Sequence, residues 1–444
     1  RQRQMCIRDR YKLINSLECK LSKFAPYQVI IFGFVTYILT GLLFISLPCA
    51  QKIHVSFVDN LFNIVSALST TGLSTGNISQ LYTPFGKLVL LTLIQLGAIG
   101  YMTITSFFIL SSGNNLSSYR TKILSAEFTL PENFNIKEFI RNIIIYTFVI
   151  ELIGTIFLSI EFHKLGITNP VWAGVFHAIS AFSTAGFSIF STGLEAFKND
   201  ISINIIIAFL CYSGAIGFII PMDIYRKIID KNHKITFTTK VILFITALVG
   251  ILGTVLYLFN SDSNVLTAFF QVMSASTTAG FNTVNIGKLS TTSLAVLIAA
   301  MVIGASPSGT GGGIKSTSIS VLLGIVGSVM RGQFKQITFL NKAIPLNRVF
   351  TAVASTTTYM FTLIIIVYLL TLTEHFSFME LCFEAASALG TVGLSMGITA
   401  DLTNLGKIIL SLAMFLGRVG PLSIGIAFFK SNSNIVACKS DLAT

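Results

Sequence analysis

A thirteen-residue phrase that recurs four times constrains the fold of this chain more than any other feature of its sequence. The copies occupy residues 62–74, 176–188, 270–282 and 383–395. Each copy places Phe, Ser-Ala, Thr and Gly at the same offsets, and ten residues separate the Phe from the Gly. Because a single repeat unit cannot bury its inner face alone, the four copies predict four equivalent units around one axis.

The composition predicts that these units lie in a membrane. Hydrophobic residues make up 53% of the chain and charged residues 11%, whereas a soluble domain carries about 25% charged residues. Apolar runs of about twenty residues, the length that crosses a bilayer, recur along the chain. The formal net charge of +12 comes from basic residues between these runs. This pattern is typical of membrane topology, so we expect no nucleic-acid partner.

Each copy of the phrase is flanked by two apolar stretches, and a short apolar run leads into it. The stretches before the copies cover residues 27–47, 139–160, 238–259 and 349–372, and those after them 85–110, 202–225, 290–330 and 405–429. The short runs, at 57–69, 171–183, 265–277 and 378–389, cannot span a bilayer. We therefore expect half-helices that enter the membrane and stop.

The predicted fold is an all-α polytopic membrane protein of four fused membrane–pore-loop–membrane repeats around a pseudo-fourfold pore, with about eight spanning helices and four half-helices. Residues 1–23 are expected to form a cytoplasmic N-terminal segment, in which residues 1–10 resemble a remnant not native to the protein. The repeats are expected at 24–112, 113–228, 229–332 and 333–430, with a cytoplasmic tail at 431–444.

The distribution of Lys and Arg predicts the orientation of the chain. Segments on one side of the expected spans hold 22 of the 30 basic residues, and segments on the opposite side hold six. Because positively charged loops remain in the cytoplasm, we expect a multi-pass protein of the bacterial cell membrane with both termini inside. All four phrases then lie toward the outside.

The phrase suits a binding site for a monovalent cation. Non-helical backbone at membrane depth is tolerated where it lines a cavity, and glycine lets carbonyl groups turn toward an axis. Four such strands would form rings of oxygen ligands, and the C-terminal ends of the half-helices add a negative field. The expected selectivity filter consists of Thr70, Thr71, Gly72, Leu73, Thr184, Ala185, Gly186, Phe187, Thr278, Ala279, Gly280, Phe281, Thr391, Val392, Gly393 and Leu394.

Two other interpretations of these motifs are weaker. Ser, Ala and Gly also favour close helix packing in membranes, but four copies that each follow a helix too short to span favour the filter. The sequence Gly313-Ile314-Lys315-Ser316-Thr317 resembles the end of a phosphate-binding loop. That pattern needs adjacent Gly and Lys after a strand, so we expect no nucleotide bound by this chain.

With these motifs, the chain resembles the Trk/Ktr/HKT superfamily of cation transporters and is most similar to the KtrB-type membrane subunit. The resemblance covers about residues 24–430. In that superfamily, glycine in all four filter strands is associated with K⁺, and serine in the first strand with Na⁺ preference in some plant members. The resemblance therefore implies K⁺ at the backbone carbonyls of Gly72, Gly186, Gly280 and Gly393. A Na⁺ or mixed Na⁺/K⁺ transporter of the same fold is the alternative.

The partners are implied by the resemblance alone. Relatives of the KtrB type form homodimers in the lipid bilayer and work with a separate cytoplasmic nucleotide-binding regulatory subunit of the RCK or KTN type. The basic inner loops could contact such a subunit, but the positive-inside bias explains these loops equally well.

Small residues interrupt the apolar stretch that follows the third phrase. A helix cannot continue through residues 304–313, which are rich in Gly and contain Pro307. By resemblance, segment 304–316 is an intramembrane loop beneath the filter that gates the pore; a kinked helix or an external loop is the alternative. The expected gate residues are Gly304, Ser306, Pro307, Ser308, Gly309, Thr310, Gly311, Gly312, Gly313, Lys315 and Arg418.

Arg418 lies within a G-x-x-G pattern at 417–420 that also occurs at 97–100 and 214–217. An Arg at membrane depth is costly and normally faces a cavity or a partner, and by resemblance this one lies beneath the filter. Glu384 and Glu151 are candidate partners, and a snorkelling Arg is the alternative. We expect only the third repeat to have a broken second span.

Two other classes of function fit the sequence less well. A substrate-coupled secondary transporter would have inverted pairs of repeats, whereas these phrases share one orientation. A membrane enzyme needs a catalytic constellation, but the five histidines are dispersed. The predicted function is potassium uptake by an ion-conducting subunit that is not an enzyme.

Overall fold

The computed structural model describes residues 24–111, 116–128, 135–259, 261, 263–333 and 336–428. These residues are almost entirely helical, apart from a two-stranded antiparallel ribbon of β1 (Thr338–Phe339) and β2 (Lys342–Ala343). The expected cytoplasmic segments at 1–23 and 431–444 lie outside the described residues.

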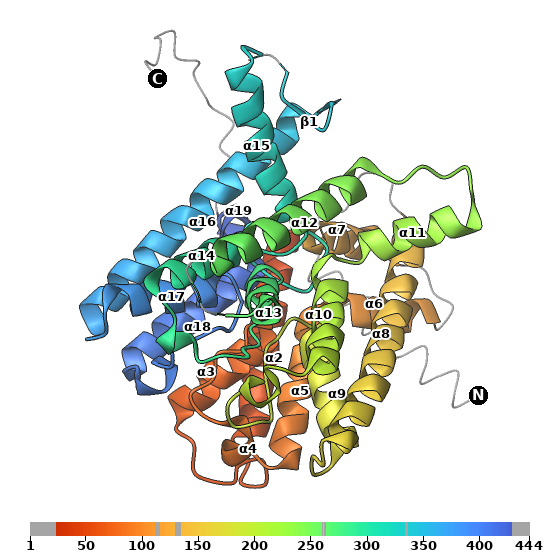
Figure 1. Ribbon diagram of the computed structural model, residues 1–444. Coiled ribbons are helices and arrows are strands. Elements are labelled where there is room, and N and C mark those ends of the chain that lie inside the picture. The colour runs from red at the N-terminus through yellow and green to blue at the C-terminus, as the bar shows by residue number, and fades with distance from the viewer. Residues whose placement is uncertain are drawn as a thin grey trace, which may run out of the picture.

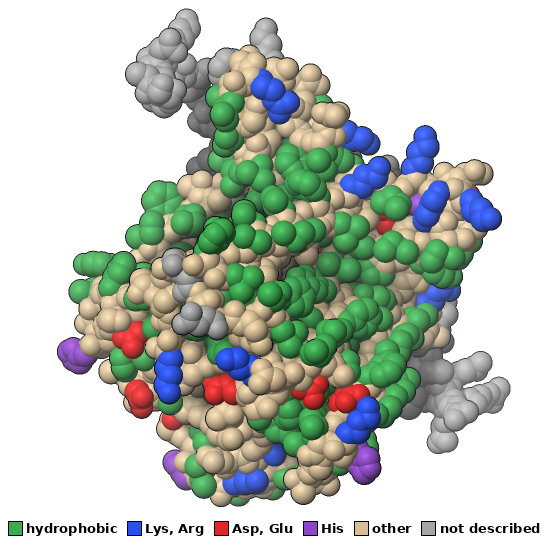
Figure 2. All heavy atoms as spheres, in the orientation of Figure 1, with side chains coloured by type: hydrophobic (Ala, Val, Ile, Leu, Met, Phe, Trp, Pro, Cys, Tyr) green, Lys and Arg blue, Asp and Glu red, His purple; other side chains and the backbone are tan. Residues whose placement is uncertain are grey.

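The first helix of each repeat is an unbroken span, as the apolar stretches predicted. These helices are α2 (Pro26–Ile45), α8 (Ile136–Lys164), α12 (Phe237–Leu258) and α16 (Leu346–Thr373), and each is long and apolar enough to cross a bilayer. Large apolar side chains on them are exposed, among them Ile251 and Phe361. Figure 2 shows a broad hydrophobic band; the charged side chains near α11 and α15 are mostly Lys and Arg, whereas the opposite end carries Lys and Arg together with Asp and Glu. Such a surface suits contact with lipid.

The four half-helices confirm the prediction of apolar helices too short to span. They are α3 (Phe57–Leu68), α9 (Pro170–Phe182), α13 (Val265–Ser276) and α17 (Phe378–Leu389). At 1.5 Å per residue, twelve residues reach about 18 Å into a hydrocarbon layer of about 30 Å. Three of these helices begin at a side-chain cap, provided by Ser56, Asn264 and Ser377.

The second span is broken in every repeat, so the expectation of a break in the third repeat alone is wrong. Sharp bends join α5 (Pro84–Ile99) to α6 (Tyr101–Ser111), α10 (Ile201–Ala215) to α11 (Ile219–Ile229), and α18 (Asn404–Val419) to α19 (Pro421–Phe428), at 77°, 90° and 83°. In the third repeat, residues 303–315 separate α14 (Thr291–Val302) from α15 (Ser316–Met330).

The bends have one cause, the second glycine of each G-x-x-G pattern. Gly100, Gly217 and Gly420 have φ values of 83°, 84° and 90°, a region that residues with a Cβ rarely adopt. A helix cannot continue through such a residue. The G-x-x-G pattern, which in the sequence is only a recurring motif, therefore marks the place where each helix breaks.

Shorter elements complete the connections between the spans. They are α4 (Ile78–Leu81), α7 (Ser118–Glu127) and the 3₁₀ turns η1 (Glu195–Phe197), η2 (Ile286–Lys288) and η3 (Thr399–Asp401).

The four repeats pack as a closed ring. Within each repeat, the half-helix contacts the helix before it and the helix after it. Between repeats, α5 packs on α9, α10 on α13, α14 on α17, and α18 returns to α3. Figure 1 shows the half-helices gathered toward the middle of the molecule, with the long helices around them. The phenylalanine of every phrase is fully buried in this arrangement: Phe62, Phe176, Phe270 and Phe383.

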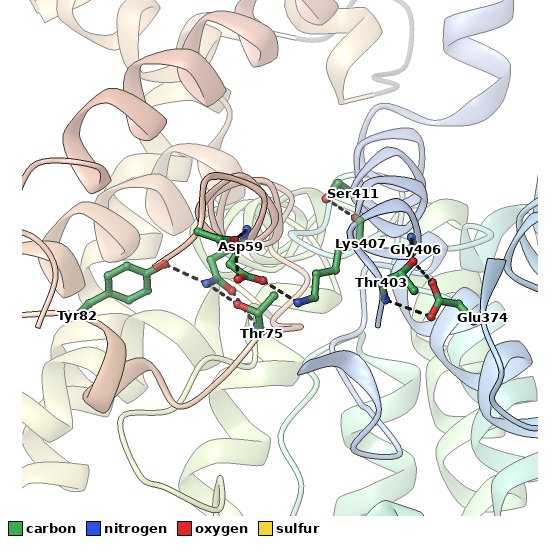
Figure 3. A network of polar contacts seen from close by, with 10 residues as sticks. Asp59, Thr75, Tyr82, Glu374, Thr403, Gly406, Lys407 and Ser411 are labelled. Carbon is green, nitrogen blue, oxygen red and sulfur yellow. Dashed lines mark hydrogen bonds and ion pairs between the residues drawn. The ribbon is translucent and has the colours of Figure 1, made fainter. Parts of the chain in front are cut away.

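A polar network joins the fourth repeat to the first at the outer ends of α3 and α18 (Figure 3). The Nζ atom of Lys407 lies 2.8 Å from Oδ1 of Asp59, and Ser56 Oγ donates to Oδ2 of the same carboxylate at 2.6 Å. Glu374, at the end of α16, accepts hydrogen bonds from Thr403 N and Oγ1 at the start of α18. The Lys407–Asp59 pair closes the ring where its first and last repeats meet, and the Glu374 bonds hold α16 to α18 within the fourth repeat.

The Asp59 carboxyl is held in its charged form. Burial raises its pKa, but hydrogen bonds from Lys407 and Ser56 outweigh burial and leave the pKa below the ordinary value. A lowered carboxylate pKa gives stability that is present above the unfolded-state value, about 4, and is lost as the pH falls through the folded-state value.

We predict that Lys407→Met and Asp59→Asn each lower the thermal stability of the purified protein, because each leaves a half-buried charge or dipole without its partner. The coupling between the two sites, about 1 kcal/mol, should appear in a double-mutant cycle at pH 7 and be lost as the pH falls below about 4, the ordinary pKa of a free Asp. Additive effects at pH 7 would contradict this assignment. Lys288→Met, at an exposed position, is the control.

Candidate ion-conduction site

Each half-helix ends in the same turn. In the first repeat, the amide of Thr70 donates to Ala67 O at 3.1 Å, and that of Thr71 donates to Ser66 O at 2.9 Å. This pair of bonds is the Schellman arrangement that ends many helices. Equivalent pairs occur at Thr184, Thr278 and Thr391. All four half-helices therefore stop at corresponding positions of the repeated phrase.

The serine of the phrase extends this turn. Ser66 Oγ accepts from the amide of Gly72 at 3.1 Å, and Ser387 Oγ accepts from that of Gly393 at 3.0 Å. In the second repeat, Ser180 Oγ donates instead to Phe187 O at 2.9 Å. In these three repeats the serine hydroxyl fixes the strand that leaves the turn, whereas the hydroxyl of Ser274 in the third repeat has no partner among the described residues.

The threonines of the phrase have a rare backbone conformation. Thr70, Thr184, Thr278 and Thr391 have φ between 51° and 57°, and they are four of the seven described non-glycine residues with positive φ. Glycine is the usual residue at this position of the turn, and a β-branched residue is disfavoured there. All four side chains are fully buried, and the hydroxyls of Thr70 and Thr184 make hydrogen bonds that offset part of this strain.

The four filter glycines form a ring in which each one lies against the next repeat. Their φ values are 100°, 63°, 78° and 95° at Gly72, Gly186, Gly280 and Gly393. A Cβ atom added to Gly72 would collide with the carbonyl oxygen of Ala185. In the same way, a Cβ atom added to Gly186, Gly280 or Gly393 would collide with the carbonyl oxygen of Ala279, Val392 or Thr71, respectively. The four strands therefore surround one axis in the order of the repeats.

The remaining expected filter residues support this ring from behind. Leu73, Phe187, Phe281 and Leu394, one from each strand, are each 1% exposed. The structure thus brings all sixteen expected filter residues together, although they are spread over more than 300 positions of the sequence.

The segment between α14 and α15 is a hairpin-like loop with a narrow neck. Ile303 and Ile314 form a parallel bridge, and the amide of Ala305 donates to Gly312 O at 3.1 Å. Ser306 and Ser308 hold the loop to the bend between α10 and α11, through Ala215 O and the amide of Ile219. A kinked helix or an external loop is therefore excluded for these residues.

The tip of this loop contacts the threonine of every strand. Thr70 Oγ1 donates to Thr310 O at 3.2 Å, and the hydroxyls of Thr184 and Thr310 lie 3.0 Å apart. A Cβ atom added to Gly311 or Gly312 would collide with the hydroxyl of Thr278 or Thr391. The loop therefore covers the end of the ring at which the half-helices stop.

Arg418 holds the loop tip in place through backbone oxygens. Its guanidinium group donates to Thr310 O and Gly97 O, and to Thr70 Oγ1 at 3.2 Å. The hydrogen bonds of the two candidate carboxylates go elsewhere. Glu384 accepts from Ser395, Met396 and Thr399, and Glu151 accepts from Gln95. Carbonyl groups, not these carboxylates, are thus the described partners of the buried charge.

Lys315 also belongs to the loop. Its Nζ atom donates to Gly311 O at 2.8 Å, and the side chain is half-buried. This bond ties the end of the loop to its tip.

The ring and the loop tip offer oxygen atoms of a kind that suits a hard monovalent cation. The hydroxyl oxygens of Thr278 and Thr391 are buried and have no hydrogen-bond partner among the described residues. Buried polar atoms normally have a hydrogen-bond partner, so these two oxygens are free to bind a cation.

Sequence reasoning missed the carbonyl groups of the G-x-x-G patterns as site components. Gly97 O accepts from Arg418, and Gly214 O accepts from the amide of Thr310 at 3.2 Å. The first glycine of each pattern lies against the last carbonyl of a half-helix, at Leu68, Phe182 or Leu389. The signal was the threefold recurrence of the pattern, 24 to 28 residues after the glycine of the phrase.

Comparisons with known proteins agree with this geometry. The TrkH family of cation transport proteins matches residues 91–436. The chain is 32% identical to the Ktr system potassium uptake protein B of Bacillus subtilis, over 94% of this chain and 96% of the relative. It is 30% identical to the potassium/sodium uptake protein NtpJ of Enterococcus hirae, over 90% of this chain and 92% of the relative.

A solved structure shows the same fold. The potassium transporter TrkH from Vibrio parahaemolyticus superposes with a TM-score of 0.66 at 20% identity, covering 89% of this chain and 84% of that chain. From its repeated ring and these relatives together, the chain belongs to the TrkH cation transport family and is a multi-pass membrane transporter, not an enzyme.

Proposed function

We propose that this chain is the potassium-conducting subunit of a Ktr-type uptake system. The observation that carries the proposal is the closed ring of four glycine-containing strands, each ending a half-helix with its negative end toward the ring. K⁺ binds at the backbone carbonyls of Gly72, Gly186, Gly280 and Gly393. The ion moves down its electrochemical gradient, to which the membrane potential contributes about 2.3 kcal/mol per 100 mV.

A mixed potassium and sodium transporter is the second candidate. It is favoured by the 30% identity to a relative named for both ions. The glycine in all four strands supports K⁺ as the preferred ion. With glycine at these positions the ion ligands are backbone carbonyls, and the number and field strength of such carbonyls determine which cation is preferred.

The loop at 303–315 acts as the gate of this pore. Its support is the contact of residues 310–312 with all four threonines. Arg418 keeps the gate closed by binding Thr310 O, and its positive charge raises a barrier to a cation below the filter. Opening requires these hydrogen bonds to break together.

The assembly is proposed from the relatives and the charge pattern. The subunit forms a homodimer in the bacterial cell membrane with both termini in the cytoplasm. A regulatory RCK or KTN subunit binds the basic inner side and opens the gate. The excess of Lys and Arg on that side supports this orientation.

We expect cells that lack their own K⁺ uptake systems to take up K⁺ when they express this chain, with faster uptake when a KTN-type ring is co-expressed. Equal uptake of Na⁺ and K⁺ would favour the mixed transporter. No uptake of either ion, from protein detected in the membrane, would refute the proposed function.

Gly72→Ser should lower the preference for K⁺ over Na⁺ by about tenfold, or about 1.4 kcal/mol. The reason is that the new Cβ meets Ala185 O and the residue must keep a φ of 100°. Competition of Na⁺ with K⁺ uptake measures this preference. Gly76→Ser, four positions away and without a backbone clash, is the control and should match the wild type.

Deletion of residues 306–313 should raise K⁺ flux in the absence of the regulatory subunit, because the loop tip no longer covers the ring. Arg418→Gln should also raise the flux, since Thr310 O at the tip loses the guanidinium group that joins it to Gly97 O. Flux into proteoliposomes measures both effects. A deletion variant that reconstitutes but keeps the resting flux of the wild type would show that the loop is not the gate.

A further inference from the structure

One position of the repeated phrase is polar in every copy, although it lies on a half-helix within the core. It follows the phenylalanine and carries Asn63, His177, Gln271 and Glu384. All four side chains are fully buried. Burial of a polar group is costly unless it is hydrogen-bonded, so four buried polar residues at one repeated position need a structural reason.

Each of these side chains bonds to the strand that leaves the filter glycine. Asn63 donates to Thr75 Oγ1 at 3.2 Å and accepts from the amide of Thr75 at 3.1 Å. Gln271 donates to Thr283 Oγ1 at 3.0 Å. In both repeats the hydroxyl lies three residues after the glycine.

The second and fourth repeats make the same connection with ionisable groups. The imidazole of His177 lies 2.8 Å from Ala173 O and 2.9 Å from Ser188 Oγ. Because a carbonyl only accepts, Nδ1 carries the proton, and Nε2 of the neutral ring accepts from Ser188. Glu384 accepts from Ser395 Oγ, the amide of Met396 and Thr399 Oγ1. The hydroxyls of Ser188 and Ser395 lie two residues after the glycine.

We propose that Asn63, His177, Gln271 and Glu384 are positioning residues of the selectivity filter, and that they set its preference for K⁺ by holding the outer part of each strand. The inference rests on the proposed function. Each strand is fixed on its inner side by the helix-ending turn and on its outer side by one of these residues. Without the outer bond, the glycine carbonyls would adjust to a smaller ion at lower cost.

The hydrogen bonds that these four residues make to their strands differ in number. Glu384 makes three hydrogen bonds to its strand and the connection that follows, whereas Gln271 makes one to Thr283. The fourth strand is therefore the most rigid, and Glu384 is the residue whose loss should have the largest effect on ion preference.

The test uses the full-length protein in cells that lack their own K⁺ uptake, with uptake kinetics measured for K⁺ and for Na⁺ as a competitor. Ser395→Ala removes one hydroxyl from the strand, and Glu384→Leu removes all the accepting oxygens. Glu384→Gln keeps an acceptor of nearly the same shape. Ser159→Ala, a serine on α8 whose hydroxyl has no partner among the described residues, is the matched control.

We expect Ser395→Ala to raise the KM for K⁺ by about fivefold, since one hydrogen bond contributes about 1 kcal/mol, with the maximal rate unchanged and the inhibition constant for Na⁺ no higher than in the wild type. Glu384→Leu should raise the KM further, and Glu384→Gln should restore most of the loss. Ser159→Ala should match the wild type. If Glu384→Leu does not reach the membrane, Ser395→Ala carries the test.

The inference is overturned if Ser395→Ala is present in the membrane at the wild-type level and keeps the wild-type ratio of K⁺ to Na⁺ affinity. It is also overturned if Glu384→Gln is as defective as Glu384→Leu, because charge rather than strand position would then be responsible. A wild-type protein that takes up no K⁺ would refute the proposed function itself. Loss of selectivity in Gly72→Ser, without loss in these variants, would refute only this inference.

Discussion

The whole structure depends on ending four helices in the middle of a membrane. Backbone groups that lose their helical partners at that depth find no water, and each unsatisfied group costs several kcal/mol. The same Schellman turn solves this problem four times, at Thr70, Thr184, Thr278 and Thr391. The strand that leaves each turn is then the non-helical backbone that a cation site requires.

The ring follows from how closely these strands approach one another. Each filter glycine lies against a carbonyl of the next repeat, and a side chain at any one of them would separate two neighbours. The first glycine of each G-x-x-G pattern brings a second span against the end of a half-helix, at Leu68, Phe182 and Leu389. Close packing of small residues is a common basis for helix association in membranes.

The repeats share this frame but differ in what they add to it. The third repeat replaces a bent span with a loop whose tip covers the ring, and the fourth supplies Arg418, which binds that tip through Thr310 O. The outer polar network of Asp59 and Lys407 occurs where the fourth repeat meets the first. In a chain with fused repeats, each such difference can be confined to one repeat, so the loop and Arg418 occur once while the ring of strands is built by all four.

The sequence by itself determined the elements and the site residues. Hydrophobic length defined the four unbroken spans and the half-helices, and the fixed spacing from Phe to Gly predicted sixteen filter residues that the structure brings together, because both features are local and repeat four times. The sequence could not give the bends at Gly100, Gly217 and Gly420, since an apolar stretch looks the same whether its helix is straight or broken. Tertiary structure alone decided the partners of Arg418, because any carbonyl can accept its hydrogen bonds and only folding selects the carbonyls of Gly97 and Thr310.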